Sequence, residues 1–158
     1  MKKTLISFIV LSFFLPAPAF SIDVNETANI ILDSTIPWRE RIKLIDEISP
    51  TRSQKVLATL ITVYNDAFLN SACPSILYHT VNGLRYYQGD NAAIRIVRRA
   101  IYDREPEVRM ISLEVLGVIG TEEDIAYLKP FLTSKNFFES NNAQIAIEQI
   151  ASRSKGPK

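Results

Sequence analysis

The sequence predicts an all-α fold built from about four stacked helical hairpins. Apolar residues fall at helical spacing along nearly the whole chain, and no stretch shows the alternation that is typical of a half-buried strand. Val56, Leu60 and Tyr64, for example, lie on one face of a predicted helix. Three prolines begin predicted helices, where the missing N–H costs nothing, at positions 37, 74 and 106. Their spacing of 37 and 32 residues is within the period of stacked helical hairpins.

The first 21 residues predict a secretory signal peptide. Two lysines precede an apolar run from residue 5 to residue 15, and the small-residue stretch PAPAFS follows. This run is shorter than the about 20 residues that a transmembrane helix needs, so we expect cleavage after Ala19 or Ser21 and no stable membrane insertion. The pattern indicates export to the periplasm of a Gram-negative bacterium.

The remaining chain has the length of one ordinary domain. Residues 22–153 are the predicted helical repeat domain, and residues 154–158 are a predicted disordered tail. Removal of the leader takes two lysines from the 18 basic residues, which leaves 16 against 17 acidic residues and a net charge of −1. A nucleic-acid-binding domain would show a basic excess, so we expect no nucleic-acid partner.

The four predicted helix pairs follow one another along the chain. They span 25–36 with 37–48, 51–66 with 74–87, 90–102 with 106–119, and 122–132 with 137–152. Capping residues stand at three breaks between them, at Thr51, Asp90 and Thr121. The acids at 122–124 face the positive end of a helix, and this capping role accounts for them better than a metal site.

The third pair carries a recognisable motif. The stretch YDREPEVRMISLEVLGVIGTEEDIAYLKPFL resembles a HEAT repeat of the short bacterial type, which is also found in phycobilisome-lyase-like proteins. The matching positions are Asp103, Pro106, Val108, Arg109, Ser112, Leu116 and Gly117. The resemblance implies a right-handed α-solenoid in which the aspartate and the arginine form ladders between neighbouring repeats. It also implies that the second helices line a concave face.

The sequence shows no recognisable catalytic set. It has a single histidine, a single cysteine and no Gly-rich loop. Cys73 and His79 lie six residues apart, but no third group that would orient the imidazole is evident. We therefore expect no catalytic residue, no metal, no cofactor and no enzyme. The lone Cys73 cannot form an intramolecular disulfide, and we interpret it as a small apolar residue before the helix that starts at Pro74.

Cationic and aromatic side chains on the predicted second helices are of the types that anchor protein interfaces. The predicted partner-binding residues are Arg39, Arg41, His79, Tyr86 and Arg109. Two further aromatic residues, Trp38 and Tyr87, are expected in the core.

These observations predict a non-enzymatic periplasmic protein-binding module. Its most concrete form is an immunity or inhibitor protein that captures a toxin or an envelope protein. An envelope assembly adaptor and a small hydrolase with an unrecognised active site are the alternatives. The identity of the partner stays open, as does a homodimer through Cys73 or the end repeats.

Overall fold

The computed structural model describes residues 23–69 and 73–155, and this part of the chain is helical throughout apart from its connections. The described α-helices are α1 (Val24–Leu32), α2 (Trp38–Ile48), α3 (Gln54–Leu69), α4 (Pro74–Gly83), α5 (Asn91–Ala100), α6 (Pro106–Ile119), α7 (Ile125–Leu128) and α8 (Phe137–Ser154). Short 3-10 helices follow α2, α4, α6 and α7, at η1 (Ser49–Thr51), η2 (Leu84–Tyr86), η3 (Glu122–Asp124) and η4 (Lys129–Thr133). The predicted signal peptide lies outside the described residues, as does 156–158 of the predicted tail.

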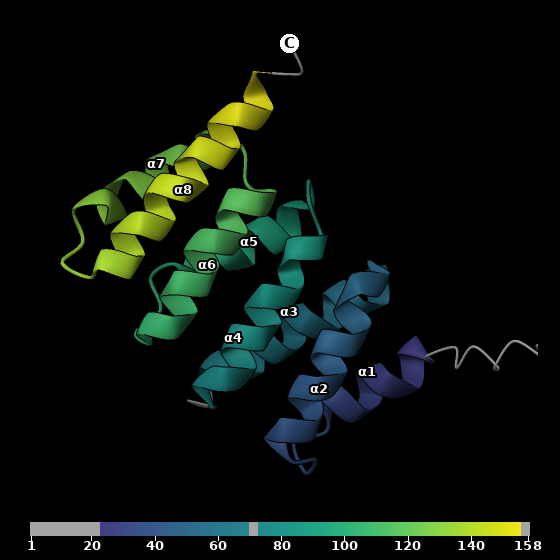
Figure 1. Cartoon of the computed structure of the whole chain (residues 1–158). Helices are drawn as coiled ribbons and strands as arrows, with labels where there is room; N and C mark the ends of the chain where they lie inside the picture. Colours follow the sequence, from purple (N-terminus) through teal and green to yellow (C-terminus); the bar gives the residue numbers. More distant parts are fainter. Residues whose placement is uncertain (1–22, 70–72, 156–158) are drawn as a thin grey trace, which may run out of the picture.

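The helices pair in chain order and the pairs stack into a solenoid. The contacts within pairs join α1 to α2, α3 to α4, α5 to α6 and α7 to α8. Figure 1 shows the second helices of the pairs, α2, α4, α6 and α8, side by side in one layer, with α1, α3, α5 and α7 behind them. This arrangement confirms the predicted all-α solenoid of four hairpins.

One continuous core runs through the stack between the two layers. It extends from Ile31 in the first hairpin to Ile150 in the last. In α5 the apolar side chains of Ala93, Ile94 and Val97 are buried, whereas Arg95 is exposed. The helical period of apolar residues therefore gives each helix one face for the core. Within the described ranges, no helix combines the length and the apolarity that crossing a bilayer requires.

Local signals set most helix boundaries. Gly89 has a left-handed φ of 81°, and the Asp90 side chain that follows accepts hydrogen bonds from the backbone N–H groups that begin α5. Thr121 caps the helix as predicted, and it forms a capping box with Asp124. The expected cap at Thr51 is wrong, because the hydroxyl of Ser53 accepts the hydrogen bond from Val56 N at 3.1 Å. The chain passes through η1 before α3 begins, which moves the cap two residues along.

The second helices approach one another closely at small residues. A Cβ atom added to Gly117 in α6 would lie 2.8 Å from the Cα of Ala146 in α8. Real Cβ atoms essentially never come so close to a backbone atom. The glycine therefore sets the distance between the third and fourth hairpins.

A buried ion pair joins α5 to the fourth hairpin. Arg98 Nε donates to Asp124 Oδ1 at 2.5 Å, and the Asp124 side chain is fully buried. Burial acts to raise the pKa of this carboxyl. The hydrogen bonds from Arg98 and Thr121 outweigh it and hold the pKa below its ordinary value of 3.8.

Replacing Gly117 with alanine tests the close approach of α6 to α8, because helix propensity and packing change the stability in opposite directions. Alanine is the better helix former by about 1 kcal/mol, so a Gly117→Ala change on a free helix face would stabilise the chain. Overpacking costs about 1 to 3 kcal/mol, and the opposing atom here belongs to the backbone. We therefore expect a net loss of roughly 1 kcal/mol in the free energy of unfolding, measured by denaturant melting. A gain in stability would contradict the packing described for α6 and α8.

Replacing Asp124 with asparagine tests the buried ion pair. A hydrogen bond to a charged group contributes about 1.5 to 3 kcal/mol, so Asp124→Asn lowers the free energy of unfolding by that amount at pH 7. Because the pKa of Asp124 is lower in the folded protein, its ionised carboxyl stabilises the fold fully at pH values above the ordinary pKa of 3.8. This stabilisation is lost as the pH falls through the pKa of the folded state. Denaturant melts between neutral and acid pH should show the difference between wild type and variant shrinking below about pH 4. The exposed neighbour Glu122 provides the control Glu122→Gln, for which we expect a change within about 0.5 kcal/mol at pH 7.

Candidate functional site

The structure distributes the five predicted partner-binding residues over several places. Arg41 lies at the junction of the first hairpin, where its Nε donates to the carbonyl oxygen of Ile31 at 2.7 Å. Its guanidinium thus satisfies the last turn of α1. A partner-binding role for Arg41 stays a prediction.

Arg109 joins the third and fourth hairpins. Its Nε and Nη2 both donate to Oε1 of Glu139 in α8, at 2.8 and 2.5 Å. Its Nη1 donates to the carbonyl oxygens of Asp103 and Arg104, both at 2.9 Å. Glu139 is buried and also accepts a hydrogen bond from Ser134 Oγ at 2.7 Å. Arg109 therefore bridges two repeats. Its acidic partner is Glu139, whereas Asp103, the acid that the resemblance implied, contributes only its backbone carbonyl oxygen.

Arg39 lies beside Trp38 at the beginning of α2. The guanidinium carbon of Arg39 is 4.5 Å from the centroid of the Trp38 ring, a cation–π distance. The expectation that Trp38 is a core residue is wrong, because 39% of it is exposed. It occupies the first turn of α2, in the first hairpin, where no preceding hairpin covers it within the described residues. Tyr87 is buried as predicted, and burial raises its pKa to about 12.

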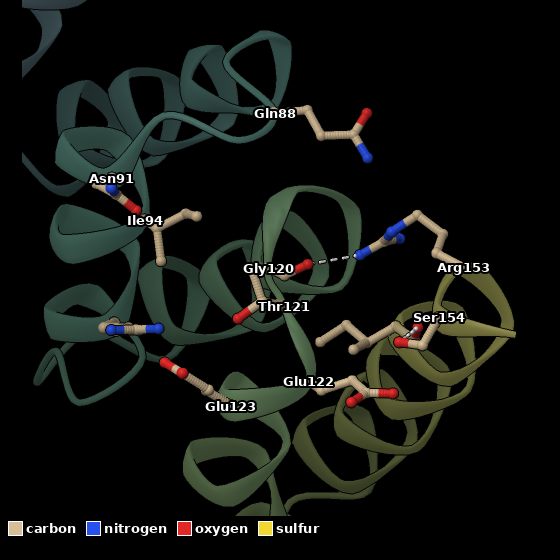
Figure 2. A pocket seen from close by; sticks show the side chains of 11 residues that line it. Gln88, Asn91, Ile94, Gly120, Thr121, Glu122, Glu123, Arg153 and Ser154 are labelled. Atoms are coloured by element: carbon tan, nitrogen blue, oxygen red, sulfur yellow. Dashed lines mark hydrogen bonds between the residues drawn. The ribbon is translucent and has the colours of Figure 1, made fainter. Parts of the chain in front are cut away.

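Tyr86 lies in η2 at the edge of the solenoid and lines a hollow of about 750 Å³. A second edge hollow, of about 740 Å³, lies between the start of α5, the loop after α6 and the end of α8. Figure 2 shows Arg153 in this hollow turned toward Gly120, whose carbonyl oxygen accepts its hydrogen bond at 2.9 Å. Arg98, on the same wall, donates to Asp124. Both arginines of this wide edge hollow thus donate hydrogen bonds to groups of the protein itself.

A different surface brings side chains of three second helices together. Two adjoining hollows of about 290 and 220 Å³ lie over α4, α6 and α8, and they share Tyr78 and Glu107. We call this surface the groove. Its lining residues are Pro74, Ser75, Tyr78, His79, Glu107, Met110, Ile111, Glu114, Phe138 and Asn142.

Aromatic and thioether side chains give the groove an apolar character. Phe138 is 65% exposed, although phenylalanine is a residue type that folding usually buries. Tyr78 packs partly against the core, and its ring meets the His79 ring edge-on at 5.3 Å. His79 Nδ1 lies 2.9 Å from Asp46 Oδ1 of α2. His79 is thus the one predicted partner-binding residue that lies in the groove, at its border with the first hairpin.

The groove contains two carboxylates and an amide that offer acceptor oxygens. Glu114 forms an ion pair with Arg85. Glu107 is exposed, and its carboxylate makes no hydrogen bond or ion pair within the described part of the chain. Asn142 donates from Nδ2 to the carbonyl oxygen of Met110 at 3.2 Å, which leaves its Oδ1 as an acceptor.

Sequence reasoning missed most of the groove. Glu107, Met110 and Glu114 follow one another at a spacing of three and four residues, which puts them on one face of α6. That spacing was available from the sequence, but Glu107 reads equally well as a first-turn acid at a helix start. The exposure of Phe138 was not available, because the helical period does not show which hairpin covers a given face. Among the described residues, no three His, Cys, Asp or Glu side chains gather as metal ligands.

Comparisons with known proteins agree with this architecture. A sequence profile described as HEAT repeats matches residues 66–148, just over half of the 158 residues. The solved structure of human deoxyhypusine hydroxylase in complex with glycerol is similar, with a TM-score of 0.69 and 20% sequence identity. The similarity covers 85% of this chain and 46% of that one, so this chain spans about half the length of the hydroxylase. No curated protein matches the sequence.

The structural similarity corrects one expectation. We expected no enzyme because a helical solenoid without a recognisable catalytic set suggested binding alone. That inference is wrong, since deoxyhypusine hydroxylase is an enzyme that has this fold. At 20% identity the similarity extends to the fold and assigns no activity to this chain. The stacked hairpins and the profile match over residues 66–148 together show that the chain belongs to the HEAT-repeat family.

Proposed function

We propose that this protein binds another protein by accepting an extended segment of it in the groove over α4, α6 and α8. The exposure of Phe138 carries the proposal. A large aromatic side chain that is 65% exposed leaves apolar area in water, and here it lies beside Met110 in a hollowed surface. Aromatic residues in such positions are the side chains that contribute most to protein interfaces.

The size of the hollows supports a protein segment as the occupant. At about 290 and 220 Å³, each is smaller than the about 300 to 1,000 Å³ of typical small-molecule pockets. Neighbouring hollows of this size fit successive side chains of one chain. The solenoid supports such binding, because helical repeats form a continuous surface whose exposed positions vary without unfolding the core.

The pattern of the first 21 residues supports a second part of the proposal, export to the periplasm. In that compartment the captured partner is a toxin or an envelope protein, and the protein acts as an immunity factor, an inhibitor or an assembly adaptor. These roles use the same surface. The identity of the captured partner distinguishes them.

Substitution of Phe138 tests the binding surface. We expect Phe138→Ala to reduce the amount of partner that the tagged protein captures from envelope extracts by at least about tenfold, since truncating an aromatic anchor typically costs more than about 1.4 kcal/mol. The captured proteins are identified and quantified by mass spectrometry.

The adjacent Phe137 provides a matched control. It is 73% exposed and meets Phe138 edge-on at 5.8 Å, but it does not line the groove. Phe137→Ala should therefore capture the partner at wild-type strength, and thermal melting should show both variants folded. Equal capture by the Phe138→Ala variant and the wild type would refute the groove as the binding surface.

The export proposal is tested by the mass of the exported protein. Cleavage after Ala19 or Ser21 gives a mature chain that begins at Phe20 or Ile22. Cell fractionation followed by intact-mass measurement should find one of these two masses in the periplasmic fraction. Full-length protein confined to the cytoplasm would contradict export.

A further inference from the structure

We infer that the segment held in the groove carries an arginine next to an apolar side chain. This inference deepens the proposed function and depends on it. It specifies the chemistry of the partner, which the fold alone leaves open.

Two acceptors of the groove, on Glu107 and Asn142, have no donor from the described part of the protein. Glu107 is an exposed carboxylate without a partner in the described structure, and it belongs to both hollows. Asn142 adds Oδ1 as a second acceptor, because its Nδ2 already donates to Met110. A ligand that satisfies both needs several N–H donors within a short reach, and the guanidinium group offers five.

The charges around the groove do not balance. The two arginines at its border each pair with an acid of the same chain, Arg85 with Glu114 and Arg109 with Glu139. The His79 ring lies against Asp46. Glu107 is left over, so the groove carries a negative charge that no described side chain neutralises. A cationic group on the partner complements it, whereas an acidic segment is repelled.

Apolar side chains line the groove beside Glu107. Tyr78 borders both hollows with Glu107, and Met110 and Phe138 line the second one. A planar guanidinium stacks on aromatic faces while its edge donates to a carboxylate, and a lysine ammonium lacks this combination. The exposed ring of Phe138 needs an apolar neighbour on the same segment to remove it from water. Arginine beside an apolar residue meets both requirements.

The experiment selects peptides and then removes one charge from each side. A phage-displayed library of random peptides is selected on the purified protein, and bound sequences should be enriched in arginine next to an aliphatic or aromatic residue. The best peptide is then synthesised with arginine and with citrulline, which keeps the shape and loses the charge. We expect citrulline to weaken binding about tenfold, as measured by calorimetry or fluorescence anisotropy.

Glu107→Gln tests whether this carboxylate is responsible. In this variant the affinity ratio between the arginine and citrulline peptides should fall from about ten toward one, because the double-mutant cycle isolates the pair. Glu122→Gln removes the same charge from the edge hollow and should leave the ratio unchanged. The ratio in the wild type should also fall as salt is added.

The outcomes separate this inference from the function on which it rests. Suppose that peptides bind and that Phe138→Ala weakens their binding. If citrulline then leaves the affinity unchanged, or if the affinity ratio stays near ten in the Glu107→Gln variant, the arginine inference is overturned and the groove remains a binding surface. If no peptide binds, or if Phe138→Ala leaves peptide binding intact, the proposed function fails and the inference fails with it.

Discussion

The close approach of neighbouring second helices is the constraint on which the rest of the structure depends. Gly117 lets α6 come so near to α8 that an added Cβ would overlap the backbone of Ala146. A similar contact occurs at Gly83 in α4, where a Cβ would lie 2.5 Å from Ser49 Oγ. These small residues set the spacing of the helices in this layer, and the two adjoining hollows of the groove lie over the same layer.

The charged residues fall into two groups, those that connect hairpins and those that face solvent. Arg109 and Arg98 have carboxylate partners that are almost fully buried, Glu139 and Asp124, and both pairs connect one hairpin to the next. Removing the arginine of either pair would leave a buried carboxylate uncompensated, so these pairs favour the observed order of the hairpins. Glu107 plays no such part, because it faces solvent beside Tyr78. The contrast separates residues that build the solenoid from a residue that is available to a partner.

Membership of the HEAT-repeat family describes the scaffold and leaves its use open. One protein of similar fold is deoxyhypusine hydroxylase, so solenoids of this kind serve catalysis as well as binding. For this chain the surface favours binding. An exposed phenylalanine, a thioether and an unpaired carboxylate meet in hollows of side-chain size. Function on such scaffolds is decided by the few side chains on the outer layer.

The sequence by itself determined the helices, the number of hairpins and most of their boundaries, because these depend on local interactions. Proline at the start of α6, the Gly89–Asp90 break and the capping box at Thr121 each act within a few residues. The tertiary structure alone decided which side chains are exposed. The sequence suggests that Arg109 is an interface residue, but in the structure its guanidinium donates to Glu139, 30 positions away. The sequence suggests that Trp38 is a core residue, but it is exposed because no preceding hairpin covers it in the described structure. The helical period defines the faces of a helix, but the packing of neighbouring hairpins determines which face is left for a partner.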